Sequence, residues 1–148
     1  MLRPAQVRRR VLDEHTRIAG WLGELEHLAG RLRAGEPELR PELLRRVASL
    51  RTFFSSHLEL EEHVLAPALR RAGTRGAERA RRLVAEHDAQ RAALARFADG
   101  LGAPDTSPEQ LAEAVEAFVE DVRRDMRAEE RVELDPALFA DPDGEAEA

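Results

Sequence analysis

The chain has 148 residues, 43% of them hydrophobic and 35% charged, which is typical of one globular domain. It has no run of about 18 apolar residues, so a membrane-spanning helix is excluded. It also has no cysteine, which excludes disulfides, iron–sulfur clusters and thiolate metal sites. The net charge of −6 comes mainly from residues 135–148, which carry five acids and no base. The remainder is nearly neutral and has no basic face with interleaved aromatics, so nucleic-acid binding is not expected.

Helical periodicity, with apolar residues at i, i+3, i+4 and i+7, marks four segments, whereas the alternation typical of strands never persists. The four segments span residues 4–33, 41–71, 77–99 and about 108–134. Pro67 lies inside the second segment and predicts a kink or break near residues 63–67. Ser107, Pro108 and Gln110 form the clearest helix start, a capping box with proline at the first helical position.

Four long helices joined by short connections predict an all-α fold, an antiparallel up-down four-helix bundle. We expect this bundle to occupy residues 1–138. Residues 139–148 are acidic and lack an apolar face, so they are expected to form a disordered tail. The first ten residues, MLRPAQVRRR, are not followed by an apolar stretch of the secretory type, and we therefore expect a cytoplasmic protein.

Ionisable residues interrupt the apolar stripe of every helix, and burying such groups is costly unless they are paired or bound to metal. Positions i+3 and i+4 share one face of a helix, so these residues are expected to point into the bundle. They are His15, His57, Glu61, His87, Asp125 and Glu129. In each half of the chain, a histidine on one helix precedes an i, i+4 pair on the next. Such a repeat predicts a dinuclear carboxylate site with pseudo-twofold symmetry in the bundle core.

These residues make the chain resemble the hemerythrin-like (HHE cation-binding) domain family over roughly residues 8–138. The resemblance rests on His15, the His57-x-x-x-Glu61-Glu62 motif, His87 and the Glu129-Glu130 pair. It implies a bundle around a non-haem di-iron site, with two iron ions joined by an oxo or hydroxo bridge. It also implies roles in O2, NO or peroxide chemistry, in iron or redox sensing, or in storage. The six inward residues would then be the metal ligands, with Glu61 and Glu129 as candidates to bridge both metals.

Two positions depart from the family pattern. The family usually has histidine in place of Asp125, and members closest to the oxygen carriers have a second histidine where this chain has Arg91. Asp125 is expected to bind a metal or to hold a metal-bound water. As an alternative, it forms a buried ion pair with Arg91 that leaves a mononuclear or degenerate site. A ligating Asp125 would favour the ferric state, and manganese or zinc would also suit a His/carboxylate site.

Other ionisable residues near the six follow different expectations. Glu14 is expected at the surface, as are His27 and His63, which lie well round the helix from His15 and His57. Glu62 and Glu130 each follow a bridging candidate by one residue. They are expected at the surface or as salt-bridge partners of the ligands.

The leading functional prediction is a non-haem di-iron protein that binds or reacts with O2, NO or reactive oxygen species. Six protein ligands for two metals leave open coordination positions, which favour access by such small molecules. The first alternative is an iron- or redox-sensing regulatory module that acts through a protein partner. The second is a mononuclear or metal-free degenerate bundle. Each of these classes is compatible with any oligomeric state.

Overall fold

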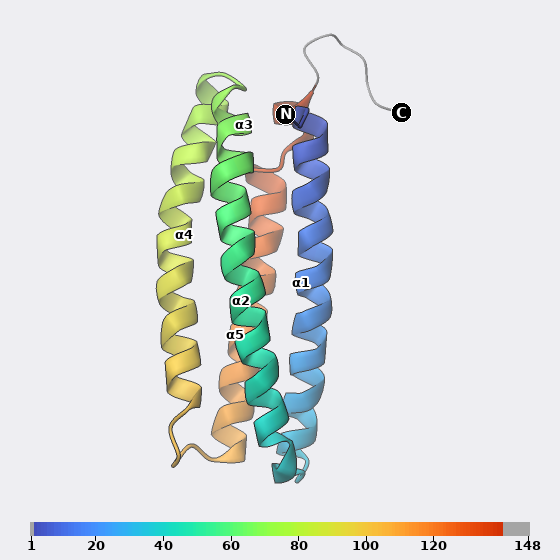
Figure 1. Ribbon diagram of the computed structural model, residues 1–148, viewed down its shortest axis with the longest axis vertical. Coiled ribbons are helices and arrows are strands. Elements are labelled where there is room, and N and C mark those ends of the chain that lie inside the picture. The colour runs from blue at the N-terminus through green and yellow to red at the C-terminus, as the bar shows by residue number, and fades with distance from the viewer. Residues whose placement is uncertain (1, 141–148) are drawn as a thin grey trace.

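Four long helical rods lie side by side in the computed structural model, which describes residues 2–140 (Figure 1). The four rods are α1 (Pro4–Arg33); α2 (Arg40–Leu60) continued through a π-helical turn (Glu61–Leu65) into α3 (Ala66–Arg70); α4 (Thr74–Leu101); and α5 (Pro108–Val132). Short 3-10 helices at Pro37–Leu39 and Pro136–Phe139 complete the secondary structure. No strand occurs among the described residues, and the rods alternate in direction. The predicted all-α antiparallel bundle is confirmed. The predicted acidic tail lies outside the described residues from position 141 onward.

The helix ends follow local signals in the sequence. At the start of α5, the Ser107 hydroxyl accepts a hydrogen bond from the Gln110 amide at 3.1 Å. The Gln110 side chain accepts one from the Ser107 amide at 3.0 Å, so the predicted capping box is present. Helix α4 starts at Thr74, three residues before the predicted start. Gly73 precedes it with a φ of 89°, a conformation that favours glycine and allows the tight turn from α3.

The second rod changes its helical geometry before Pro67. Residues Glu61–Leu65 form a π-helical turn, in which the Ala66 amide donates to the Glu61 carbonyl five residues earlier. Pro67 itself lies in the first turn of α3, where its missing amide hydrogen is not needed. The predicted irregularity is therefore present, but it begins at residue 61 instead of 63. Both Glu61 and Leu65, the first and last residues of this turn, are buried.

Two apolar clusters fill the bundle on either side of the level of the inward histidines. The larger cluster contains Ile18, Leu22, Leu25, Leu50, Leu58, Leu94, Val115 and Val122, among others. The smaller cluster contains Val7, Val11, Leu65, Leu69, Leu83, Leu134, Leu138 and Phe139, among others. On α1, for example, His15 stands between Val11 of one cluster and Ile18 of the other. None of the described helices combines the length and apolar character that a bilayer span requires.

Candidate metal centre

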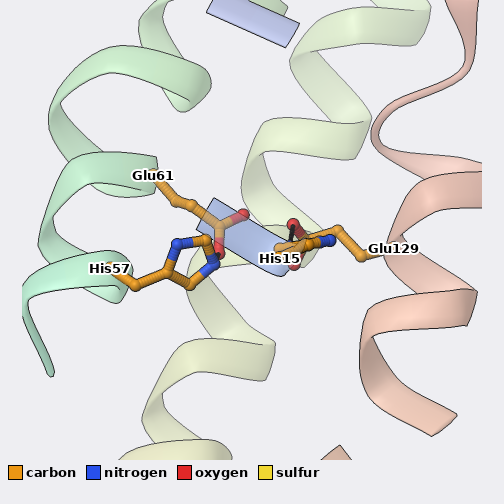
Figure 2. A group of neighbouring side chains, drawn as sticks. All are labelled: His15, His57, Glu61 and Glu129. Atoms are coloured by element: carbon orange, nitrogen blue, oxygen red, sulfur yellow. Dashed lines mark ion pairs between the residues drawn. The ribbon is translucent and has the colours of Figure 1, made fainter. Parts of the chain in front are cut away.

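Four ionisable side chains meet between the two apolar clusters (Figure 2). They are His15 from α1, His57 from the last turn of α2, Glu61 from the start of the π-turn and Glu129 from α5. Each offers one ligand atom, and these atoms lie within 4.8 Å of one another. None of the four residues is more than 7% exposed. Two carboxylates and two imidazoles so close together and so deeply buried are costly unless protons or a cation balance their charge.

The imidazole Nε2 atoms face the two central carboxylates. His57 Nε2 lies 2.7 Å from Glu61 Oε1, and His15 Nε2 lies 3.2 Å from Glu129 Oε1. His87, which is fully buried on α4, places its Nε2 3.7 Å from the same Glu61 oxygen that His57 contacts. All four rods therefore contribute to the centre, and Glu61 stands between two histidines that come from different rods.

The Nδ1 atom of each histidine faces a carboxylate on a neighbouring rod. These pairs are His57 with Glu14 at 2.8 Å, His87 with Glu62 at 3.1 Å and His15 with Glu130 at 3.7 Å. Histidines that bind metals usually direct their second ring nitrogen to such an acceptor, which orients the ring and increases its basicity. The three carboxylates leave each Nε2 aimed at the centre of the bundle.

Glu14 was expected at the surface, and that prediction was wrong. Its side chain is 21% exposed and points toward α2, where it binds the His57 ring. Residue 14 lies about 100° round the helix from His15, so it faces the next rod while His15 faces the core. Glu62 and Glu130 have the predicted role of partners to the histidines. His27 and His63 are exposed, as predicted.

Several buried atoms at the centre have no hydrogen-bond partner. These atoms are His15 Nε2, His87 Nε2, Glu61 Oε2 and Glu129 Oε1. Unsatisfied buried polar atoms are rare in folded proteins, because each has lost its hydration without compensation. A cation that bound these nitrogen and oxygen atoms would satisfy them. Imidazole and carboxylate donors suit iron, manganese and zinc, so the residues present fit a metal.

The two central carboxyls differ in their affinity for a proton. Burial acts to raise the pKa of Glu61, but the contacts of its carboxyl with Glu129, His57 and His87 hold the pKa well below its usual range. Burial and the charge of Glu61 raise the pKa of Glu129 well above its usual value. In the metal-free protein Glu129 therefore holds a proton more readily than Glu61 does. A cation bound between the two carboxyls would displace it.

The two histidines of the group also differ. Burial and the charge of His57 lower the pKa of His15, so this ring is neutral and its nitrogen lone pair is available. Burial acts to lower the pKa of His57, but hydrogen bonds with Glu61 and Glu14 outweigh it and raise the pKa. His57 therefore retains a proton more readily than His15. Metal binding at this centre is expected to release protons from both His57 and Glu129.

The structure does not bring Asp125 to the other five candidates. Its side chain is exposed and lines an open groove of about 430 Å³ between α4 and α5, together with Glu86 and Asp121. The inward stripe of α5 passes from Val122 through Met126 to Glu129, and Met126 packs against the larger apolar cluster. Met126, four residues after Val122 and three before Glu129, therefore holds the inward position that the sequence interpretation gave to Asp125.

The alternative ion pair between Asp125 and Arg91 does not form, so that prediction was wrong. Arg91 Nη1 lies 2.6 Å from Glu62 Oε1 and 4.0 Å from Asp88 Oδ1. Glu62 reaches α4 from the π-helical turn and holds both His87 and Arg91. The position of the π-turn, which helical periodicity does not describe, gives Arg91 this partner.

One buried acid was missed by the sequence analysis. Glu133 follows Glu129 by one turn, is 2% exposed, and has an Oε1 atom without a hydrogen-bond partner. Burial and the charge of Glu86 raise the pKa of Glu133 to about 6. The i, i+4 spacing from Glu129 was the available signal.

Comparison with known proteins gives one family match. The family model described as the hemerythrin HHE cation binding domain matches residues 7–135, most of the chain. The matched range contains all six candidate ligands as well as Glu133. A search of curated proteins and a search of solved structures each returned no significant match.

Proposed function

This chain belongs to the hemerythrin HHE cation-binding domain family, and on that premise we propose a non-haem di-iron protein that binds or reacts with O2, NO or reactive oxygen species. One observation carries the proposal. Four buried residues of ligand type, from three rods, place their ligand atoms within 4.8 Å of one another. Bound iron would supply one-electron chemistry and open coordination positions for a small molecule.

The residues divide between two metal positions. His15 and His57 would bind one iron through their Nε2 atoms, and Glu61 and Glu129 would each give it a carboxylate oxygen. His87, on the far side of Glu61, would bind the other iron. Glu61 Oε1 lies 2.7 Å from His57 Nε2 and 3.7 Å from His87 Nε2, which supports its role as a bridge between the positions.

The surroundings of the centre favour small neutral ligands over charged ones. The two apolar clusters close the bundle above and below the histidines. The Phe54 ring lies 6.2 Å from the His57 ring, centroid to centroid, and adds an apolar wall on that side. Exclusion of water strengthens the contacts between the histidines and their carboxylate partners, and it keeps the rings in one orientation.

A mononuclear site is the second candidate, and one observation favours it. The group of mutually close ligands contains only one histidine pair, on the α1–α2 side of the bundle. On the α4 side, Arg91 is engaged by Glu62, and Asp125 is exposed. The position near His87 therefore has fewer of the expected ligands than the position near His15.

Anaerobic titration with ferrous iron, followed by elemental analysis of the desalted protein, tests both candidates. Two irons per chain and the near-ultraviolet absorption of an oxo-bridged pair after oxidation are expected. One iron per chain would support the mononuclear site, and no iron would reject both candidates. Elemental analysis of protein as purified also shows whether manganese or zinc replaces iron.

A paired set of variants shows whether the metal binds at this centre. The His57→Ala, Glu61→Ala double variant should lose bound iron. The control is the Glu59→Ala, His63→Ala double variant, which removes the same residue types from exposed positions of the same rod. Equal iron content in the two double variants would place the metal elsewhere.

A further inference from the structure

Arg91 is a charged residue beside the centre that cannot be one of its ligands, because a guanidinium has hydrogen-bond donors but no acceptor. It lies on α4 one turn after His87, so the two residues share a face of that helix. Its Nη1 atom lies 2.6 Å from Glu62 Oε1, and its side chain is 39% exposed. The link between Arg91 and the centre is therefore the carboxylate of Glu62.

One oxygen of Glu62 contacts both of these neighbours. Glu62 Oε1 lies 3.1 Å from His87 Nδ1 and 2.6 Å from Arg91 Nη1. The contact with Arg91 is the shorter one and joins two opposite charges, so it is the stronger of the two. Asp88, another acid beside Arg91, lies 4.0 Å away and is 81% exposed, so it competes weakly for the guanidinium. The place of the Glu62 carboxylate is therefore set mainly by Arg91.

Glu62 needs such a contact if it is to stay against His87. Its side chain is long and flexible and is 23% exposed, so water competes for its oxygens. It also comes from the π-helical turn of the second rod and has to reach across to α4. A hydrogen bond from one neutral imidazole offsets little of that freedom. The ion pair with Arg91 adds a second and stronger contact from the same face of α4.

The position of Glu62 decides which nitrogen of the His87 ring carries its proton. A carboxylate beside Nδ1 accepts a hydrogen bond, so the proton stays on Nδ1 and Nε2 keeps its lone pair. His87 Nε2 is buried, has no hydrogen-bond partner and lies 3.7 Å from Glu61 Oε1. If Glu62 turned to solvent, the ring proton would be free to move to Nε2. The lone pair would then no longer face the centre.

We propose that Arg91 is a positioning residue, which holds Glu62 against His87 Nδ1 and so keeps the Nε2 lone pair of that ring directed into the centre. The orientation of the ring follows from the contacts just described. The consequence for metal binding rests on the proposed function, in which His87 binds a metal through Nε2. Loss of Arg91 then weakens metal binding, although Glu62 and His87 are both still present.

Nitrogen-15 NMR of the histidine rings in the metal-free full chain at alkaline pH tests the positioning, because it shows which ring nitrogen carries the proton. The wild type should contain His87 with its proton on Nδ1. Arg91→Met, which keeps the apolar stem and removes the guanidinium, should move proton occupancy to Nε2, and Arg91→Lys should restore the Nδ1 form. Arg81→Met, at an exposed arginine of the same helix, is the control and should match the wild type. An unchanged Nδ1 proton in Arg91→Met, or an Nε2 proton already in the wild type, would overturn the proposal.

Titration of the same proteins with Mn²⁺, with free Mn²⁺ measured by electron paramagnetic resonance, separates this inference from the proposed function. The wild type and Arg81→Met should bind two Mn²⁺ per chain with equal affinity. Arg91→Met should bind the second Mn²⁺ about tenfold more weakly, and Arg91→Lys should recover most of that loss. If the wild type binds no metal, the proposed function fails, and the proton position on His87 still decides the role of Arg91. If Arg91→Met moves the ring proton but binds both Mn²⁺ as the wild type does, the positioning by Arg91 stands and the assignment of His87 as a ligand is overturned.

Discussion

The two halves of the bundle have the same pattern of acids and histidines in their sequences, but these residues make different contacts in the structure. In the first half, Glu14 of α1 reaches across to α2 and holds His57 Nδ1 at 2.8 Å. Glu86 of α4 occupies the equivalent place in the second half, but residue 125 on α5 is an aspartate instead of a histidine. Glu86 therefore pairs with Arg82 on its own helix at 3.0 Å.

Charge explains why the second half differs. Burial raises the pKa of Asp125, and the charges of Asp121 and Glu86 add to this effect. Asp125 lies at the solvent-exposed groove with Glu86 and Asp121, where water screens the repulsion among the three acids. In the first half, Glu14 holds a histidine of the facing helix. In the second half, Glu86 pairs with Arg82, and Glu62 from the second rod holds His87 instead.

The largest effect is expected from the first half. In the wild type, a metal bound at 1,000 times its dissociation constant should stabilise the folded state by about 4 kcal/mol. This difference between loaded and chelated protein should disappear in the His57→Ala, Glu61→Ala double variant, because two of the four close ligands are gone. Thermal melting with and without a chelator measures it. A wild-type melting temperature unchanged by chelation would show that no metal bound at this centre stabilises the folded state.

The next effect concerns Glu133 in the metal-free protein. Its folded pKa of about 6 lies above the ordinary value of 4.5, so its contribution to stability is present below pH 4.5 and is lost as the pH rises through 6. The rise in pKa from 4.5 to about 6 corresponds to roughly 2 kcal/mol. Glu133→Gln should therefore be more stable than the wild type by roughly this amount at pH 8.

Denaturant unfolding of chelated wild type and Glu133→Gln at pH 3 and pH 8 measures this difference. The two proteins should converge at the lower pH, since the wild-type carboxyl is then almost fully protonated in both folded and unfolded states. A difference that is the same at both pH values would show that the substitution acts through packing and not through charge.

A smaller effect separates Glu14 from Glu86. Glu14→Gln removes the charged partner of His57 and should weaken metal binding about tenfold, the lower end of the range for such partners. Glu86→Gln removes an acid that holds no histidine, so it should leave the affinity of the first metal unchanged. Isothermal titration with Mn²⁺ compares the two variants. Equal losses of Mn²⁺ affinity in both variants would mean that Glu14 and Glu86 contribute equally to metal binding, although only Glu14 contacts a histidine of the centre.

The smallest effect is expected for Asp125. Because its side chain is exposed, Asp125→Ala should change the stability of the metal-loaded protein by less than about 0.5 kcal/mol. Melting of loaded and chelated protein is the measurement. A loss of several kcal/mol in the loaded form alone would return Asp125 to the ligand set that the sequence pattern suggested.

Much of this protein follows from its sequence because helical periodicity is a local property. The apolar stripes predict four helices, the Ser107 box predicts where α5 begins, and Pro67 predicts an irregular second rod. The same periodicity predicts that His15 and Glu129 face the core. Each of these inferences needs only 3.6 residues per turn and the cost of burying an unpaired charge.

The tertiary structure alone decides which residues on neighbouring rods meet. Periodicity leaves a residue's direction uncertain by about 40° per turn, since four residues turn through 400°. Within that range, the rotation of α5 places Met126 inward and Asp125 outward, and it buries Glu133. The π-helical turn directs Glu62 to His87 and Arg91. Contacts between rods depend on the rotation and packing of whole helices, and no local pattern in the sequence specifies these.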